Sequence, residues 1–430
     1  MIDIRLIRED PAGVVAALKK KLFDVDFTEF LSWDEDARRL TAEVETLRAR
    51  RNKVSSEIPQ LKKKGENVDA LMKEMKEIGT RISSLEADHA AIEQRIHDFL
   101  YSLPNMPAED VAAGGKEANV VVRTSGNKPV FSFQPKDHVT LATSLRLLDY
   151  ERGAKLGGNG FWVYTGDGAL LEWALLSYFI QHHRKAGYQF ILPPHLLNYQ
   201  AGFTAGQFPK FENDVFVLRP AEGAEPGHLQ FLLPTAETAL VNLHRDEILN
   251  ESELPRRYFS YTPCYRKEAG GYGSTERGMI RGHQFNKVEL FMYTRPQDSD
   301  AMLEEMIGSA EQLMQGLGLH YQVSKLAAAD CSASMAKTYD IEVWIPSMNV
   351  YKEVSSASNA REFQARRGSM RYKDAASGKN VFLHTLNASG LATSRLFPAI
   401  LEQFQQADGS VLIPQPLQPF MGKDRLQPSA

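Results

Sequence analysis

The stretch YTPCYRKEAGGYGSTERGMIRGHQFNKVE, Tyr261–Glu289, combines the residues that decide the fold and the chemistry of this chain. Two strand-like arms enclose a glycine-rich segment, and the return arm alternates sides as a half-buried strand does. The arms carry Arg266, Glu268, Phe285 and Glu289. An arginine binds phosphate as a bidentate fork, an aromatic ring stacks on a base, and a carboxylate accepts from an exocyclic amine. The hairpin therefore suits a nucleotide, although a surface hairpin with solvated charges explains these residues equally well.

The composition is that of a globular protein: 430 residues, 43% hydrophobic and 24% charged, enough for about two or three domains. A net charge of -4 gives no general attraction for a polyanion, so any nucleic-acid contact requires a local basic patch. Cys264 and Cys331 lack the spacing of a zinc site or a disulfide framework, so we expect no zinc and a reducing compartment. The longest apolar stretch, from Ala169, is too short for a bilayer and contains Glu172. We expect a cytoplasmic protein with no membrane partner.

Apolar residues recur at heptad-like spacing in two runs near the N-terminus. The first run extends from Leu40 to Leu61 and the second from Leu71 to Leu103, with the turn residues Gly65 and Asn67 between them. This pattern predicts an antiparallel coiled-coil arm of two helices of roughly thirty residues, roughly 45 to 50 Å long. Proline removes a backbone donor and clashes with the preceding turn, so Pro59 should kink the first helix.

The first arm helix also carries a basic stripe. Most charge runs are solvated helical faces, and the alternative is a surface that reads the charge and shape of an RNA backbone. The candidates for RNA contact are Arg48, Arg51, Lys62, Lys63 and Lys64.

The composition changes after the arm and predicts three parts. We expect an N-terminal domain over 1–103, a Pro-, Gly- and Ala-rich linker over 104–130, and a second domain over 131–430. In the second domain most strand-like segments follow one another without regular helical spacers. This favours an α+β fold, with a mainly antiparallel sheet and flanking helices.

Three further stretches place polar residues where predicted strands end. Thr235–Glu237 offers a hydroxyl and a carboxylate to an ammonium group, but taken alone it fits a helix N-cap better. Glu353–Ser356 offers oxygen ligands to Mg²⁺. Asn387 and Ser389 precede an amphipathic helix that carries Arg395, and the start of such a helix can bind phosphate.

Together these motifs resemble the class II aminoacyl-tRNA synthetases, and among them the seryl-tRNA synthetase family. AGYQFILPPHLL is similar to that family's dimer-forming motif 1, the hairpin to motif 2, and NASGLATSR to motif 3. The TAE, EVSSxSN, FQARR and QPFMG segments also occur in the family's order. The resemblance covers nearly the whole chain. It implies the family's antiparallel catalytic sheet, a homodimer formed through motif 1, and ATP, L-serine and tRNA(Ser) as partners, with tRNA(Sec) by the same implication.

Carried over position by position, the resemblance implies an ATP site with Mg²⁺. Arg266 would take the α-phosphate and Arg395 the γ-phosphate end, which makes these two arginines the catalytic residues. Glu268 would accept from the adenine amine and Phe285 would stack on the base. The metal ligands would be Glu353 and Ser356. The other candidates for ATP binding are Lys267, Gly282, Val354 and Ser355.

The resemblance also implies a serine site in which Glu237 or Glu289 faces the ammonium or the hydroxyl. The serine-binding candidates are Thr235, Ala236, Glu237, Arg266, Glu289, Asn387 and Ser389. The glycine-rich segment Gly271–Glu276 would act as a flap that meets the acceptor end of tRNA. Neither adenylation of serine nor its transfer to tRNA needs a protein nucleophile, so catalysis would come from positioning and charge neutralisation.

Two other functions are compatible with parts of the sequence. A class II relative that loads an amino acid onto a carrier protein would not need the long arm. A non-catalytic RNA-binding scaffold would not need to retain Arg266, Glu268 and Arg395. With the resemblance included, RNA binding by the basic stripe becomes the favoured interpretation over a solvated face.

Overall fold

The computed structural model describes residues 1–219, 229–268 and 278–427, and the chain divides into two compact units. One unit comprises Ile2–Lys19 and Phe23–Pro104, and the other comprises Met1, Lys20–Leu22 and Asn105–Ala430. The division of the sequence into three functional domains stays a prediction.

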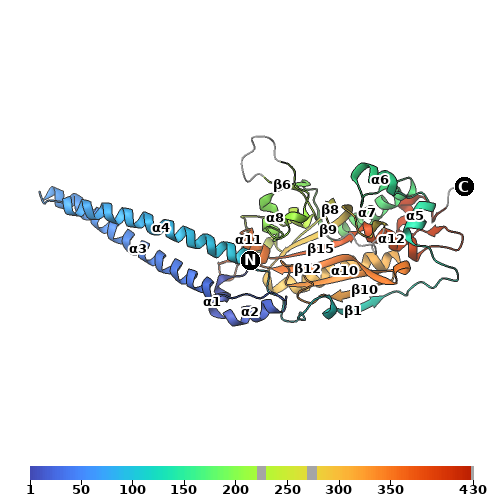
Figure 1. Cartoon of the computed structure of the whole chain (residues 1–430), viewed down its shortest axis with the longest axis horizontal. Helices are drawn as coiled ribbons and strands as arrows, with labels where there is room; N and C mark the ends of the chain where they lie inside the picture. The colour runs from blue at the N-terminus through green and yellow to red at the C-terminus, as the bar shows by residue number, and fades with distance from the viewer. Residues whose placement is uncertain (220–228, 269–277, 428–430) are drawn as a thin grey trace. The chain divides into compact units, whose positions relative to one another are not determined.

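The N-terminal unit is helical. Its two long helices lie along each other and pack through apolar side chains at heptad-like positions, including Leu40, Val44, Ile78, Ile82 and Leu85. This confirms the predicted coiled-coil arm (Figure 1). The helices of this unit are α1 (Ile4–Glu9), α2 (Pro11–Lys19), α3 (Thr28–Lys63) and α4 (Asp69–Ser102).

Helix α3 begins at Thr28, well before the start that the apolar pattern predicts at Leu40. The reason is the buried Asp34, whose carboxylate accepts from Arg8 Nε at 2.8 Å and from Arg38 Nε at 3.1 Å. The apolar pattern misses this part of the helix because a charged residue occupies a buried position, where the pattern requires an apolar one. The partners that allow Asp34 to be buried lie on another turn and on another helix. At its other end α3 continues past Pro59 to Lys63, so the proline does not end the helix.

The second unit is built on an eight-stranded sheet in the order β1-β10-β11-β12-β15-β9-β8-β4. All neighbouring pairs are antiparallel except β4 and β8, which confirms the predicted mainly antiparallel sheet. The strands are β1 (Val120–Ser125), β4 (Gln189–Phe190), β8 (Arg256–Tyr265), β9 (Gln284–Thr294), β10 (Tyr321–Lys325), β11 (Lys337–Ile345), β12 (Val350–Arg361) and β15 (His384–Ala392).

Helices cover one face of this sheet and leave part of the other face open (Figure 1). Side chains alternate along a strand, and Val288, Leu290 and Met292 of β9 enter the core beneath the helices. Phe285, Lys287 and Glu289 therefore face the opposite side. The covering helices are α7 (Asp167–Lys185), α10 (Ser299–Leu317) and α12 (Thr393–Gln403).

Short elements surround the sheet. The helices are α5 (His138–Ser144), α6 (Tyr150–Gly157), α8 (Tyr199–Ala205), α9 (Glu237–Leu240), α11 (Phe363–Arg367) and α13 (Gln418–Met421). The strands are β2 (Leu148–Asp149), β3 (Val163–Tyr164), β5 (Leu196–Asn198), β6 (Gln230–Leu232), β7 (Ile248–Asn250), β13 (Arg371–Lys373), β14 (Asn380–Phe382), β16 (Val411–Leu412) and β17 (Arg425–Leu426).

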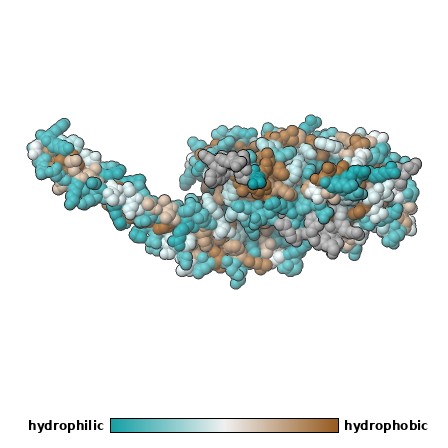
Figure 2. All heavy atoms as spheres, turned by 45° about the horizontal axis from the view of Figure 1, so that its top comes forward, coloured by the Kyte–Doolittle hydropathy of each residue, from teal (hydrophilic) through white to brown (hydrophobic). Residues whose placement is uncertain are grey.

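Part of the predicted linker over 104–130 belongs to the sheet, because Val120–Ser125 form the edge strand β1 against β10. Pro and Gly content suggested a linker, while the strand depends on a partner about two hundred residues later in the chain. The face shown in Figure 2 carries both hydrophilic areas and separate hydrophobic patches. Across the described residues, no helix combines the length and apolar character required to cross a membrane.

Candidate active site

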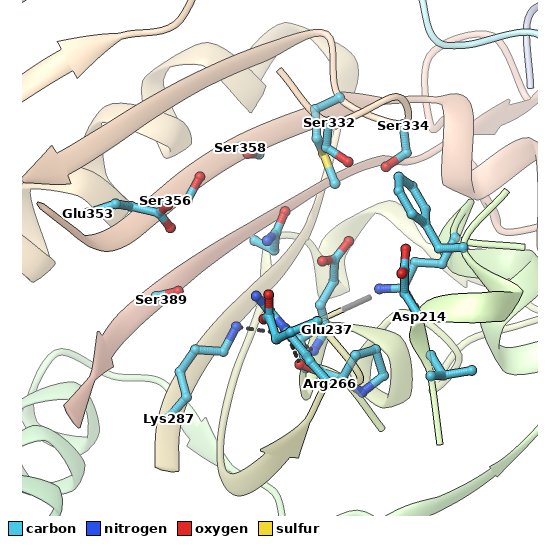
Figure 3. A pocket seen from close by; sticks show the side chains of 18 of the residues that line it. Asp214, Glu237, Arg266, Lys287, Ser332, Ser334, Glu353, Ser356, Ser358 and Ser389 are labelled. Atoms are coloured by element: carbon cyan, nitrogen blue, oxygen red, sulfur yellow. Dashed lines mark hydrogen bonds between the residues drawn. The ribbon is translucent and has the colours of Figure 1, made fainter. Parts of the chain in front are cut away.

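A polar cavity of about 470 Å³ opens on the side of the sheet that carries Lys287, and a smaller one of about 80 Å³ adjoins it. Side chains from several strands and the side chain of Glu237 point into the larger cavity (Figure 3), which Thr235 also lines. The residues that line both cavities, and so mark their junction, are Arg266, Glu268, Arg281, Lys287, Glu353 and Ser389. Residues distant in the sequence thus converge as the motifs predicted.

Strand register explains how this convergence arises. Ser389 of β15 lies directly opposite Glu289 of β9, and Ser358 of β12 lies opposite Asn387. Because neighbouring residues across an antiparallel pair share one face, the side chains of three strands gather at one place.

A bulge in β12 places the two predicted metal ligands on one face. On β11 Ile341 and Glu342 are consecutive, but their partners are Ser355 and Glu353, so Val354 is the extra residue. Residues three apart point to opposite faces of a regular strand, and one extra residue cancels that difference. Glu353 and Ser356 consequently line the same cavity.

Lys287 is the centre of a polar cluster beside the larger cavity. Its ammonium donates to Thr235 Oγ1 at 2.8 Å and pairs with Glu289 Oε2 at 2.5 Å. Asn387 Nδ2 donates to the other oxygen of Glu289 at 3.2 Å. Glu289 is fully buried and lines neither cavity, whereas Lys287 lines both. The assignment of Glu289 to serine contact stays a prediction, and Lys287, which the motif reading did not select, lines the cavity beside it.

Glu237 is the buried carboxylate that does line the cavity. Burial, and secondly the charge of Glu289, raise the pKa of Glu237 to about 7. Gln364 Nε2 donates to Glu237 Oε1 at 2.7 Å and so fixes its direction. Helix α9 begins at Glu237, and Thr235 lies before the cap residue Ala236, so the hydroxyl of Thr235 is not the cap that the alternative interpretation required.

The smaller cavity carries the predicted nucleotide residues. The Arg266 guanidinium lies over the Phe285 ring at 5.2 Å, and its Nε donates to the Pro234 carbonyl at 3.2 Å. Glu268 accepts from Arg281 Nε at 2.6 Å and has a φ of 49°, a left-handed conformation that non-glycine residues rarely adopt. Such backbone strain is common where side chains are held for function.

Arg395 and Gly282 complete that side. Arg395 donates from Nη1 to the Glu353 carbonyl at 2.7 Å and from Nε to the Ile280 carbonyl at 3.2 Å. Any side chain on Gly282 would place its Cβ about 2.3 Å from the Trp162 ring, so glycine is required for packing at this position.

Not every predicted residue reaches a cavity. Lys267 is exposed and lies outside the lining of both. Ala236 and Ser355 are buried outside the lining, and the Ser355 hydroxyl donates to the Ser389 carbonyl. Val354 lines the smaller cavity. The predicted flap over Gly271–Glu276 lies outside the described residues.

The basic stripe of the arm divides into paired and unpaired positions. Arg48 donates to Glu86 across the helix pair at 2.6 Å, and Arg51 is half-buried. Lys62, Lys63 and Lys64 are exposed at the end of α3. These three lysines are the part of the stripe best placed for a polyanion.

Three functional side chains were missed from the sequence. Lys287 lies two residues from both Phe285 and Glu289, so strand alternation alone puts it on their face. Arg281 had only its charge as a signal. Gln364 lies in the FQARR segment, but its link to the site depends on contacts with Glu237 and with Thr385, whose hydroxyl donates to it at 2.7 Å.

Two family models match the chain. Residues 1–107 match the seryl-tRNA synthetase N-terminal domain, and residues 223–404 match the tRNA synthetase class II core domain (G, H, P, S and T). The serine–tRNA ligase 2 of Clostridium acetobutylicum is 60% identical over 427 residues, which cover 99% of this chain and 100% of that relative.

Solved structures agree. The seryl-tRNA synthetase of Pyrococcus horikoshii, complexed with ATP, matches with a TM-score of 0.92 and 34% identity over 100% of both chains. The serine–tRNA ligase of Naegleria fowleri, in complex with AMP, matches with a TM-score of 0.88 and 28% identity, covering 100% of this chain and 99% of that one. With the arm, the antiparallel sheet and the two adjoining cavities, these matches show that the chain belongs to the seryl-tRNA synthetases, the serine–tRNA ligases among class II aminoacyl-tRNA synthetases.

Proposed function

We propose that this enzyme activates L-serine with ATP to seryl-adenylate, releases pyrophosphate, and transfers the seryl group to the 3′ end of tRNA(Ser). The observation that carries the proposal is the junction of the two cavities. The larger cavity, lined by Glu237, adjoins one lined by Phe285 and Arg395. Arg266 lines both, so one guanidinium reaches the carboxylate of the amino acid and the α-phosphate together.

The first step is an in-line attack by a serine carboxylate oxygen on the α-phosphorus, with pyrophosphate as the leaving group. Arg266 and Arg395 disperse the negative charge that moves to the pyrophosphate, and the protein supplies no nucleophile. The ribose hydroxyl of the tRNA terminus then attacks the activated carbonyl, and AMP leaves.

Glu353 and Ser356 fit a magnesium ion that arrives with ATP. Both offer oxygen atoms, which Mg²⁺ prefers, and the bulge at Val354 puts them on one face. A protein site with few ligands suits Mg²⁺, which keeps waters and binds phosphates. When bound there it would neutralise phosphate charge beside Arg395.

Serine-dependent exchange between ATP and labelled pyrophosphate tests the activation step. We expect exchange with serine and a strong preference over alanine, because the missing hydroxyl leaves buried polar groups without a partner. Arg266→Ala and Arg395→Ala should lower the exchange rate by at least about a hundredfold. Equal exchange with alanine, or none with any amino acid, would contradict this proposal.

The tRNA and the assembly are further parts of the proposal. Exposed Lys62, Lys63 and Lys64 support backbone recognition by the arm, a mode that reads charge and shape and also accommodates tRNA(Sec). Charging of transcripts of the two tRNAs tests the second acceptor. A homodimer through the motif 1 segment is supported by exposed apolar side chains there, such as Leu192 and Leu196.

A further inference from the structure

The chain enters and leaves the long arm at two places that hold the same loop. The segment Lys20–Leu22, just before the arm, belongs to the unit that contains the cavities, and so does the chain from Asn105 onward, just after it. Lys21 and Asn105 both donate to the loop Ser332–Ala336, which precedes β11. Residues that are adjacent to the arm in the sequence therefore determine the position of a loop more than two hundred residues later.

Every backbone carbonyl of this loop accepts a hydrogen bond from these two places. The bonds run from Lys21 Nζ to the carbonyls of Ser332 at 3.0 Å and Met335 at 2.7 Å, from Asn105 N to that of Ala333 at 2.7 Å, from Asn105 Nδ2 to that of Ser334 at 2.9 Å, and from Ala108 N to that of Ala336 at 2.8 Å. A loop has no strand partner for its carbonyls, and buried backbone acceptors need one. These donors thus fix the path of the loop backbone.

Both donor side chains are buried, Lys21 with 9% and Asn105 with 8% of the residue exposed. Burial of the ammonium lowers the pKa of Lys21 to about 8. Removing an ammonium from water costs free energy, and the two bonds to loop carbonyls offset part of that cost. The position of this lysine is accounted for by the loop that it holds.

The loop forms one wall of the larger cavity. Ser332, Ser334 and Met335 line that cavity and do not line the smaller one. In Figure 3 Ser332 and Ser334 lie across the cavity from Lys287 and Ser389, which mark the junction. The larger cavity thus has a second end, away from the residues that line the smaller cavity.

The second end suits the remaining reactant of the proposed reaction. ATP takes the smaller cavity and the amino acid takes the junction, so the ribose hydroxyl that accepts the seryl group approaches from the rest of the larger cavity. The lining there combines the aromatic ring of Phe211 with hydrogen-bonding groups of Gln207, Asp214 and Ser334. Aromatic rings stack on exposed bases, and polar groups bind base edges and ribose hydroxyls.

We propose that Lys21 and Asn105 are positioning residues for the transfer step, because they hold the cavity wall Ser332–Met335 against which the terminal nucleotide of tRNA is placed. This inference rests on the proposed transfer of the seryl group and names residues that control its geometry. Lys21 and Asn105 line neither cavity and act through the loop.

Separate measurement of the two reaction steps tests this role. Enzyme-bound seryl-adenylate is isolated and mixed with saturating tRNA(Ser) in a single-turnover experiment. Lys21→Met removes both donors and keeps the apolar stem, and it should lower the transfer rate constant about 10- to 100-fold, because a misplacement of about 1 Å has an effect of that size. Serine-dependent pyrophosphate exchange and the KM for tRNA(Ser) should each change less than about threefold.

Asn105→Ala is an independent second variant. It removes the side-chain bond to the Ser334 carbonyl and keeps the backbone bond to the Ala333 carbonyl. The same selective loss of transfer is expected. The rate of pyrophosphate exchange reports in each variant whether the catalytic unit is folded.

Lys20→Met is the matched control. Lys20 is the neighbouring lysine, and its ammonium also donates to two carbonyls, those of Glu109 at 3.2 Å and Val111 at 3.4 Å. Neither the lysine nor these two residues line a cavity of the junction. Lys20→Met should transfer the seryl group as fast as the unmodified enzyme.

Two results would overturn the inference. A parallel loss of exchange and transfer in Lys21→Met and Asn105→Ala would show that these residues serve only the fold. An unchanged transfer rate would show that the wall does not place the tRNA terminus. An unmodified enzyme that forms seryl-adenylate but does not transfer the seryl group would instead contradict the proposed function itself.

Discussion

Glu237 and Glu172 are two buried carboxyl groups whose pKa values are raised to about the same value, but only Glu237 faces a cavity. Burial raises the pKa of each to about 7. Glu237 lines the larger cavity, with Glu289, Lys287 and Arg266 as the charged groups that influence it. Glu172 lines neither cavity and is bonded inside the core. A perturbed carboxyl therefore marks a candidate site only when it also faces a cavity.

The raised pKa of Glu237 predicts a pH dependence of serine use. In the proposed serine site the ammonium pairs with the ionised carboxylate of Glu237, so the KM for serine should rise about fivefold between pH 7 and pH 6 as Glu237 takes up a proton. Pyrophosphate exchange across this range measures it. Glu237→Gln should give a higher KM that no longer changes with pH, and Glu172→Gln should keep the original profile. A Glu172→Gln profile that flattens as well would contradict the assignment to Glu237.

The same shift has a consequence for stability. Because the pKa of Glu237 rises on folding from 4.5 to about 7, the native state binds more protons than the unfolded state between these values. The stabilising contribution of Glu237 is fully present below pH 4.5 and is lost as the pH rises through about 7. Ionised Glu237 at neutral pH therefore costs folding free energy, which serine binding offsets.

Two elements that carry different motifs, β9 and α12, meet at Glu172 of α7. Asn286 of β9 donates to its Oε1 at 2.8 Å, and Thr393 at the start of α12 donates to the same oxygen at 2.6 Å. Asn286 lies between Phe285 and Lys287 in the sequence, and Thr393 lies two residues before Arg395. This buried carboxyl thereby fixes the elements that orient these three site residues.

Removal of that carboxyl should destabilise the catalytic unit. Glu172→Ala leaves the Asn286 Nδ2 donor without its partner, whereas the Thr393 hydroxyl can still donate to the Asn286 carbonyl at 3.1 Å, and an unsatisfied buried donor costs about 1–3 kcal/mol. The free energy of unfolding in urea should fall by that amount, and by less in Glu172→Gln, whose amide oxygen still accepts. Equal stability of Glu172→Ala and the unmodified protein would show that water replaces the carboxyl without cost.

At the scale of the whole molecule, the lysines of the arm are predicted to affect the charging of tRNA without affecting the activation of serine. Reversal of charge at Lys62, Lys63 and Lys64 to glutamate should raise the KM for tRNA(Ser) in the charging reaction by at least about tenfold. The KM should also depend less on salt concentration, because fewer counterions are released when tRNA binds. Serine-dependent pyrophosphate exchange should stay within about twofold. Charging and exchange kinetics at several salt concentrations measure both effects.

A matched charge reversal in the catalytic unit controls for net charge. Lys185, Lys373 and Lys379 are exposed, and their reversal to glutamate changes the net charge equally. Charging by this variant should change less than about threefold. If both triple variants lose charging equally, the arm lysines act only through the overall field of the protein.

The proposed dimer predicts that one apolar residue controls assembly. Leu192 is 71% exposed beside β4, and Leu192→Glu should shift sedimentation equilibrium from dimer to monomer. Val130 is 96% exposed outside the motif 1 segment, and Val130→Glu should leave the dimer intact. Dimerisation of Leu192→Glu at unchanged affinity would place the interface elsewhere.

The sequence by itself determined the family, the coiled-coil arm, the mainly antiparallel sheet and most of the residues that gather at the cavities. These properties depend on local periodicity and on the order of the motifs. Both can be read directly from the sequence, without knowledge of which distant residues are in contact. It missed the start of α3, because the buried Asp34 finds its charge partners on other turns and on another helix. It also read β1 as linker, because that strand exists through pairing with β10.

Only the tertiary structure decided which members of the Tyr261–Glu289 hairpin face the cavities. Glu289 is a strong candidate from its motif, yet it is fully buried behind Lys287, and Lys267 is exposed away from both cavities. Gln364 lies in the FQARR segment, whose sequence does not show that its amide orients Glu237. The physical reason is that exposure, ion pairing and pKa depend on groups brought together from distant parts of the chain, and local sequence does not specify those distances.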